Sequence, residues 1–292
     1  MNHPGEIAYL AGIARPTVAV VTNAQRAHLA GMGSLEAIAA EKGSIYTGLD
    51  ETGVAVFNAD DPWAKLWRSQ CRGLRMMTFG FEQAADVTGK FHLHGLESRL
   101  SLFAPDGQAD VVLALPGQHN ARNALAAATA ALAAGISLTA VQAGLSAFRG
   151  LKGRLQRRAA LHGAVLLDDT YNANPDSVRA GIDVLAATIG KKILVLGDMG
   201  EVGETSAQVH DEIGGYAKSQ GIDRLLALGE ASALAAHNFG SGGEHHHSID
   251  RLVASLTAEL TPETTVLVKG SRFMRMERVA DALAVPSPAE GE

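Results

Sequence analysis

Cysteine is nearly absent from this sequence, which has only Cys71 among its 292 residues. One cysteine cannot form a disulfide within the chain, and a reducing cytosol suits such a protein. No apolar run approaches the roughly 20 residues that a membrane-spanning helix needs. Residues 1–4 have neither the basic nor the apolar segment of a secretory signal. We therefore expect a cytoplasmic protein without a membrane span.

Positive charge is also in deficit, because 25 Lys and Arg residues face 31 Asp and Glu residues, for a net charge of −6. A chain with this balance lacks the general basic surface typical of proteins that bind nucleic acid, so we expect no nucleic-acid partner. The hydrophobic content of 47% is enough for full cores, and the length suits one large or two ordinary domains.

Short apolar runs alternate with helical segments in the first half of the chain, which predicts a parallel sheet. The expected strands are residues 17–21, 54–57 and 76–79, and the expected helices are 7–13, 34–42, 63–69, 120–134 and 138–147. Between residues 85 and 115, apolar and polar residues alternate around the turn 105–107, which predicts antiparallel hairpins.

The second half alternates more regularly and predicts a small Rossmann-like domain. The expected strands are 164–168, 192–197, 224–228, 264–268 and, more weakly, 245–249, with helices at 176–188, 205–219, 230–237, 249–259 and 274–284. No GxGxxG follows its first strand, so we do not expect a dinucleotide site. The glycine-containing segment 148–153 indicates a linker, and we divide the chain into domains 1–157 and 158–292.

A polar turn, residues 168–174, follows the first expected strand of this second domain. A strand that ends in Asp168 and Asp169 leads into this turn and then into Pro175. Asn174 before Pro175 suits a helix start, because an N-cap side chain accepts an unsatisfied N–H group and proline fits the first helical position. In an open α/β sheet, the carboxyl ends of strands face the ligand crevice. The turn therefore presents carboxylates, a phenol and two amides to such a crevice, although an ordinary well-capped turn explains the same residues.

The segment DDTYNANP at 168–175 resembles the signature of the Mur ligases. Further segments resemble the family in the family's order: NHPGEI at 2–7, TNAQRAHL at 22–29, GSLEAIAAEKGSI at 33–45, FNADD at 57–61, LPGQHNARNALAAA at 115–128, KGRLQ at 152–156, LGDMGEVG at 196–203 and VKGSR at 268–272. Each is weak alone, but together they are specific. DDTYNANP together with LGDMGEVG disfavours a related ligase of the folylpolyglutamate or cyanophycin type.

The resemblance implies an α/β chain in which a partial central, P-loop-type ATP-binding domain precedes a Rossmann-like domain for the incoming amino acid or dipeptide. The match is strongest with members that join D-alanyl-D-alanine to UDP-N-acetylmuramoyl tripeptide. ATP would activate the tripeptide as an acyl phosphate, which the dipeptide amine would attack, with Mg2+ neutralising the phosphates. We expect a monomer with these substrates as its partners.

The resemblance also assigns residues to metal and nucleotide. Lys42 matches the family lysine that CO2 converts to a carbamate, whose two oxygens suit Mg2+, although EKGSI replaces the usual AKGEI and a solvated lysine is the plain alternative. His28 matches the histidine beside the second metal and the ATP phosphates, and His3 is a weaker candidate. The expected nucleotide-binding residues are Asn120 and Asn123 near the adenine, with Arg154 and Asp169 at the phosphates and ribose. For Asn120, helix capping is a compatible alternative.

The expected binding pocket for the dipeptide combines residues after three parallel strands. Its members are Tyr171, Asn172, Asn174, Asp198, Ser271 and Arg272. The last two are expected to hold the dipeptide carboxylate. The consecutive histidines His245–His247 would alternate faces in a strand and cannot all bind one ion, so we expect them at the surface. Cys71 is expected to be a buried thiol.

The P-loop of the family, GTNGKT, does not occur in the sequence, and neither does any GxxxxGK[ST] segment. The glutamate that precedes NHPGEI in the family and the UDP-binding N-terminal domain are also not found. The resemblance thus covers roughly the C-terminal two thirds of a Mur ligase. We expect an incomplete form that neither hydrolyses ATP nor joins D-alanyl-D-alanine by itself. The alternative is an inactive binding or regulatory remnant of such an enzyme.

Overall fold

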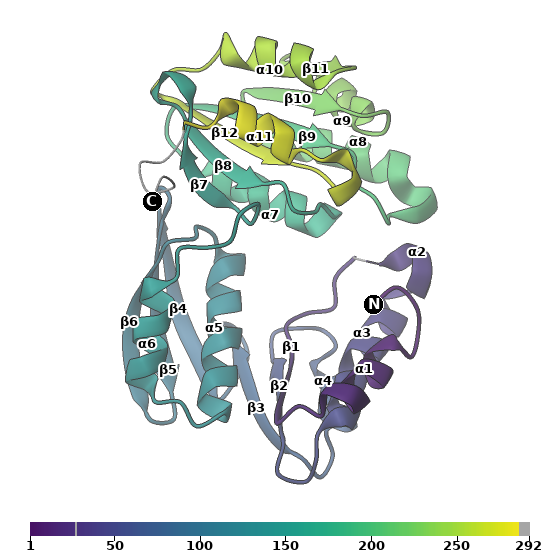
Figure 1. The fold of residues 1–292 in the computed structure, drawn as a ribbon, viewed down its shortest axis with the longest axis vertical. Helices are drawn as coiled ribbons and strands as arrows, with labels where there is room; N and C mark the ends of the chain where they lie inside the picture. The colour runs from purple at the N-terminus through teal and green to yellow at the C-terminus, as the bar shows by residue number, and fades with distance from the viewer. Residues whose placement is uncertain (27, 286–292) are drawn as a thin grey trace. The chain divides into compact units, whose positions relative to one another are not determined.

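The computed structural model describes residues 1–26 and 28–285 (Figure 1). It divides into two compact units, the first comprising Met1–Leu93 and Glu97–Phe148, and the second His94–Leu96 and the chain from Arg149 onward. The predicted division after residue 157 falls later, within the part of the chain that packs with the second unit. No helix in the described residues is both long and apolar enough to cross a membrane.

The first unit contains a six-stranded sheet with the order β1-β2-β3-β4-β5-β6. Its strands are β1 (Val18–Val21), β2 (Val54–Asn58), β3 (Arg75–Gly80), β4 (Val87–His94), β5 (Glu97–Ala104) and β6 (Gly107–Leu113). Strands β1 to β4 pair in parallel, and β5 pairs with β6 in antiparallel fashion, as the change of pattern near residue 85 predicts.

Helices cover both faces of the parallel part of this sheet. The helices of this unit are α1 (Glu6–Ala14), α2 (Leu29–Met32), α3 (Leu35–Gly43), α4 (Ala64–Gln70), α5 (Gln118–Ala133) and α6 (Leu138–Ala147), the last of which packs against β6. Val54 and Val56 of β2 belong to the core that includes α5, whereas Ala55 and Phe57 belong to the core that includes α3 and α4. A strand covered on both sides needs a continuous apolar run, which is what the sequence has there.

The second unit contains a sheet with the order β11-β10-β9-β12-β8-β7. Its strands are β7 (Gln156–Ala159), β8 (Val165–Asp169), β9 (Lys191–Gly197), β10 (Arg224–Leu228), β11 (Gly243–His246) and β12 (Thr264–Lys269). All neighbours pair in parallel except β7, which runs antiparallel to β8 at the edge. These two parallel-rich sheets confirm the predicted α/β class.

Two apolar layers enclose the second sheet. The helices are α7 (Pro175–Ala186), α8 (Ser206–Ser219), α9 (Ser232–Phe239), α10 (Ile249–Thr257) and α11 (Glu277–Leu283). One core joins α7, α8 and α9 to alternate strand residues such as Leu167 and Leu267, and the other joins α10 and α11 to Leu166 and Val266. Strand β12 lies between β8 and β9, so the carboxyl ends of these three strands are neighbours. This brings the loops that follow them to one edge of the sheet.

Candidate active-site residues

Lys42 lies in the last turn of α3, where its Nζ donates a hydrogen bond of 2.8 Å to the carbonyl oxygen of Asn23, just beyond β1. Burial lowers the pKa of Lys42, and the nearby Asp61 carboxylate partly opposes this. A lowered pKa enlarges the fraction of neutral amine, the form whose lone pair can attack CO2. The environment of Lys42 therefore differs from that of an ordinary solvated lysine.

Asp61 follows β2, and the negative charge of its carboxylate favours the protonated form of Lys42. Its carboxylate accepts backbone hydrogen bonds from Ala24 at 3.0 Å and Trp63 at 2.9 Å, while burial raises its pKa. Asp61 lies within the FNADD segment, and no role for it was predicted from the sequence. No three His, Cys, Asp or Glu side chains among the described residues group together as a metal site. A carbamate on Lys42 would add two oxygens, the ligand type that Mg2+ prefers, near Asp61.

Glu41, which replaces the usual alanine of the family motif, has a clear structural contact. Its carboxylate is buried, with 8% of the residue exposed, and accepts hydrogen bonds of 2.8 Å from the backbone N–H groups of both Gly5 and Ile7. These groups begin α1, where an acceptor with negative charge is favourable. Glu41 therefore links the segment 2–7 to α3 through these two hydrogen bonds.

The two predicted histidines lie in different settings. His28 precedes α2 in a left-handed backbone conformation with φ of 65° and is half-buried. His3 is exposed, and its Nδ1 lies 3.2 Å from Oε1 of Glu6.

The predicted asparagine pair lies on α5, but the helix begins earlier than expected. The N-cap residue is Gly117, and Asn120 lies inside the first turn, where its Nδ2 donates to the carbonyl oxygen of Pro116 at 2.8 Å. The interpretation of Asn120 as a possible cap is therefore wrong, because the helix starts two residues before it. Asn123 lies one turn further along the helix and is exposed.

Arg154 and the polar turn of the second unit lie directly against each other. The guanidinium carbon of Arg154 is 3.9 Å from the ring centroid of Tyr171, a cation–π contact. The backbone N–H of Tyr171 donates to the carbonyl oxygen of Gly153 at 3.0 Å. Gly153 has φ of +74°, and an added Cβ would lie 3.1 Å from the backbone nitrogen of Tyr171, so glycine suits this close approach. The predicted nucleotide arginine and the predicted dipeptide tyrosine thus form one surface.

The two adjacent aspartates have different environments. Asp168 is fully buried and accepts hydrogen bonds from Arg158 and from the side chain of Thr170, at 3.1 and 2.7 Å, which is a structural role. Asp169 is partly exposed and accepts from the backbone N–H of Leu155 at 3.1 Å and from Nζ of Lys269 at 2.5 Å. Only Asp169 therefore has carboxylate surface available to a ligand.

Two of the residues that were predicted to bind the dipeptide form hydrogen bonds that hold loops in place. The Oγ of Ser271, a residue that is 3% exposed, donates to the carbonyl oxygen of Ala173 at 3.1 Å and accepts from the backbone N–H of Gly200 at 2.6 Å. Asn174 forms a reciprocal capping box with Ser177 at the start of α7. Both side chains therefore use their polar atoms to hold loops at this edge of the sheet.

The other predicted dipeptide residues are more accessible. Arg272 has 66% of its side chain exposed, and its Nη1 lies 3.4 Å from Oε1 of Glu277. Asn172 is also exposed, and its Oδ1 accepts from the backbone N–H of Ala173 at 2.8 Å. Asp198 is half-buried and accepts from the backbone N–H of Ser232 at 2.8 Å.

His210 supports the loop after β9, a role that was not predicted from the sequence. It is fully buried, its Nε2 accepts from the backbone N–H of Met199 at 2.9 Å, and its Nδ1 lies 2.7 Å from the carbonyl oxygen of Ser206. The first contact makes Nε2 the acceptor, so Nδ1 carries the proton and donates. The sequence signal that could have indicated this role is a histidine in the second turn of a helix that directly follows a polar loop.

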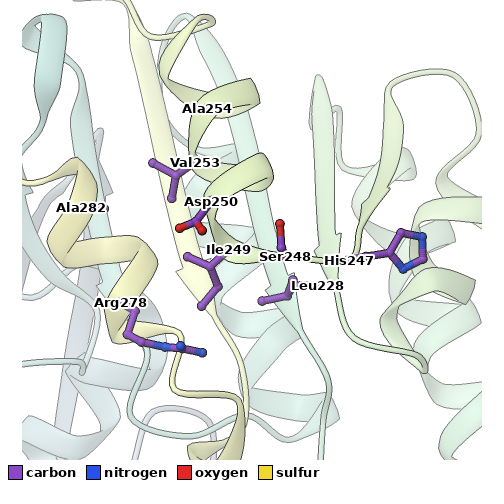
Figure 2. A pocket seen from close by; sticks show the side chains of 9 residues that line it. All are labelled: Leu228, His247, Ser248, Ile249, Asp250, Val253, Ala254, Arg278 and Ala282. Carbon is purple, nitrogen blue, oxygen red and sulfur yellow. The ribbon is translucent and has the colours of Figure 1, made fainter.

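A cavity of about 760 Å³ lies between α10 and α11 in the second unit (Figure 2). Its lining is formed by Leu228, His247, Ser248, Ile249, Asp250, Val253, Ala254, Arg278 and Ala282. No predicted site residue is among them.

The expectation that all three consecutive histidines lie at the surface is wrong for His246, which is 7% exposed, and burial lowers its pKa. Cys71 is fully buried, as expected.

The sequence matches two family models, the Mur ligase middle domain over residues 1–131 and the Mur ligase glutamate ligase domain over residues 153–272. It is 40% identical to UDP-N-acetylmuramoyl-tripeptide--D-alanyl-D-alanine ligase of Escherichia coli over 286 residues, which cover 97% of this chain and 63% of that protein. The equivalent protein of Mycobacterium tuberculosis is 37% identical over 310 residues, with coverage of 97% and 61%. The chain thus spans less than two thirds of these relatives.

Solved structures agree with the sequence matches. A crystal structure of MurF from Acinetobacter baumannii superimposes with a TM-score of 0.88 at 34% identity, covering 97% of this chain and 63% of that one. MurF from Thermotoga maritima, solved in complex with ADP, gives a TM-score of 0.84 at 27% identity, with coverage of 96% and 64%. A folylpolyglutamate synthase is more distant, at 19% identity and a TM-score of 0.65, and shows the fold alone. The chain belongs to the Mur ligase family.

Proposed function

We propose that this chain carries the acceptor domain and much of the ATP-binding domain of a ligase that joins D-alanyl-D-alanine to UDP-N-acetylmuramoyl tripeptide in peptidoglycan synthesis. The observation that carries the proposal is the contact of Arg154 and Tyr171 beside the partly exposed Asp169. A guanidinium and a carboxylate held together in this way suit the phosphates and ribose of a nucleotide. The relatives named for this reaction are up to 40% identical over nearly the whole chain. We also propose that the protein acts as a cytoplasmic monomer.

In the first unit, Lys42 and His28 would serve the phosphate end of ATP. Lys42 as a carbamate, with Asp61 close by, would supply oxygen ligands to Mg2+. When bound, the ion would offset negative charge on the phosphates. Asn120 and Asn123 lie on successive turns of α5 and would contact the adenine. The half-buried amine of Lys42 supports this assignment, since its lowered pKa favours carbamylation.

In the second unit, Tyr171, Asn172 and Arg272 would bind the dipeptide. Arg272 is exposed, and a guanidinium pairs well with a terminal carboxylate. Asp198, Asn174 and Ser271 would act around this pocket, the last two by holding its loops. Holding the dipeptide amine close to the acyl phosphate would convert a bimolecular attack into an oriented one.

The proposal is tested with Arg154→Ala in the full gene product. Loss of a charged phosphate contact should cost about 1.5–3 kcal/mol, which corresponds to a nucleotide affinity lower by about 10- to 150-fold. Isothermal titration with ATP and a coupled phosphate-release assay measure the two effects. Arg157→Ala is the matched control, because Arg157 is an exposed arginine on the adjacent strand β7. Equal ATP affinity and turnover in both variants would refute the assignment of Arg154.

A further inference from the structure

Lys269, the last residue of β12, is a buried lysine that the proposed function does not yet use. Only 2% of the residue is exposed. Lysine is almost never fully buried unless its charge is paired, because an ammonium group loses strong hydration there. The ammonium group of Lys269 therefore needs nearby groups that balance its charge.

Both partners of Lys269 belong to the polar turn 168–174. Its Nζ donates to Oδ2 of Asp169 at 2.5 Å and to the carbonyl oxygen of Asn172 at 3.0 Å. Strands β12 and β8 pair in parallel with Lys269 directly opposite Asp169, so the sheet register itself sets this pair. One ammonium group thus holds the beginning and the middle of the turn.

The contacts of Asp169 extend this arrangement to Arg154. Oδ1 of Asp169 accepts from the backbone N–H of Leu155, the residue after Arg154, while Oδ2 accepts from Lys269. A carboxylate has about four acceptor positions, so these two contacts leave it able to accept further hydrogen bonds. Each oxygen of the Asp169 carboxylate thus accepts one hydrogen bond, from Leu155 or from Lys269, and these two bonds fix the direction of its remaining acceptor positions.

We infer that Lys269 is a positioning residue for the nucleotide, which orients Asp169 toward the hydroxyl groups of a ribose and keeps Arg154 and Tyr171 in register with it. This inference rests on the proposed function. Stability alone does not explain the pair, because buried ion pairs are often no more stabilising than apolar residues of similar size. A carboxylate that Lys269 and Leu155 already hold in one direction can accept a hydroxyl hydrogen bond without the further entropy cost of ordering its side chain.

A double-mutant cycle on the full gene product tests the inference. Lys269→Met and Asp169→Asn are made singly and together, and ADP affinity is measured by isothermal titration. We expect Lys269→Met to weaken ADP binding about tenfold in the wild-type background and less than about twofold beside Asp169→Asn. Lys269→Arg, which keeps the charge, should recover part of the affinity. Lys191→Met is the control, since Lys191 pairs with Glu259 at 2.7 Å at the start of β9.

The outcomes separate the two hypotheses. If Arg154→Ala and Asp169→Asn both leave ADP affinity unchanged, the proposed nucleotide site is wrong. If these two variants weaken binding but Lys269→Met does not, or weakens it equally in both backgrounds, Lys269 has only a general structural role and the inference is wrong. Lys269→Gln replaces Lys269→Met in the cycle if the latter does not fold, because its amide keeps a donor near Asp169 and Asn172, and the same comparison decides.

Discussion

The replacement Glu41→Ala should loosen α1 while leaving the rest of the first unit folded. Glu41 accepts two backbone hydrogen bonds of 2.8 Å at the start of this helix, from Gly5 and Ile7. No side-chain cap is present at Gly5, so the carboxylate takes the place of one. Alanine would remove the acceptor and leave two N–H groups to find water at the edge of a packed surface.

The magnitude follows from the number and kind of these bonds. A hydrogen bond to a charged group contributes about 1.5–3 kcal/mol, and the upper sum is reduced here because the amides regain partial hydration, so we expect about 2–3 kcal/mol. If α1 opens locally, hydrogen exchange of its amides should accelerate by about 30- to 150-fold. Exchange in β2, which is buried throughout, should change little.

Hydrogen exchange followed by mass spectrometry measures this directly. Glu36→Ala is the matched control, because Glu36 lies in the first turn of the same helix α3 but is exposed. Glu41→Gln should fall between the two, since an amide retains one acceptor oxygen. Equal exchange rates for α1 in the Glu41 and Glu36 variants would show that the carboxylate does not hold this helix, and the reasoning from its contacts would fail.

Two further predictions concern Lys42 and Cys71. Lys42→Ala should abolish ligase activity in the full gene product, and short aliphatic acids should partly restore it, because a carboxylate resembles a carbamate; Lys42→Arg, which keeps a cation but cannot be carbamylated, should not be rescued. Wild-type turnover in the alanine variant, measured by phosphate release, would contradict this. Cys71 should resist iodoacetamide at pH 8 until the protein unfolds, because burial raises its pKa to about 11 and leaves about one thiolate in a thousand. Rapid labelling of the native protein, followed by mass spectrometry, would be inconsistent with the buried site.

The elements that the sequence predicts well are those whose burial is uniform. Residues 54–58 are all buried, so an apolar run identifies β2 without reference to other segments. Strand β7 was not predicted, because Gln156–Ala159 is an edge strand with alternating partial exposure and a polar sequence. Its pairing with β8 is a tertiary contact, which a local sequence pattern does not predict.

The candidate site divides in a similar way. The position of Asp169 and Tyr171 after a strand was evident from the order of apolar and polar residues, and the structure places Arg154 beside them. The ion pair of Asp169 with Lys269 was not evident, because the two residues are far apart in the chain and meet only when β12 enters the sheet beside β8. The burial of Ser271 likewise depends on where neighbouring loops lie. The capping role of Asn174, in contrast, is predicted by its place before Pro175, and the structure confirms it.

The hydroxyl group of Ser271 has a consequence for engineering this domain. It joins Ala173 in the loop after β8 to Gly200 in the loop after β9, and itself belongs to the loop after β12. Three segments that are far apart in the sequence thus share one hydrogen-bonding residue and, under the proposed function, should shift together when an acceptor binds. An exchange of acceptor specificity between ligases of this family would therefore need all three segments to be transplanted as a set, with the serine retained, because a single grafted loop would lose its anchor.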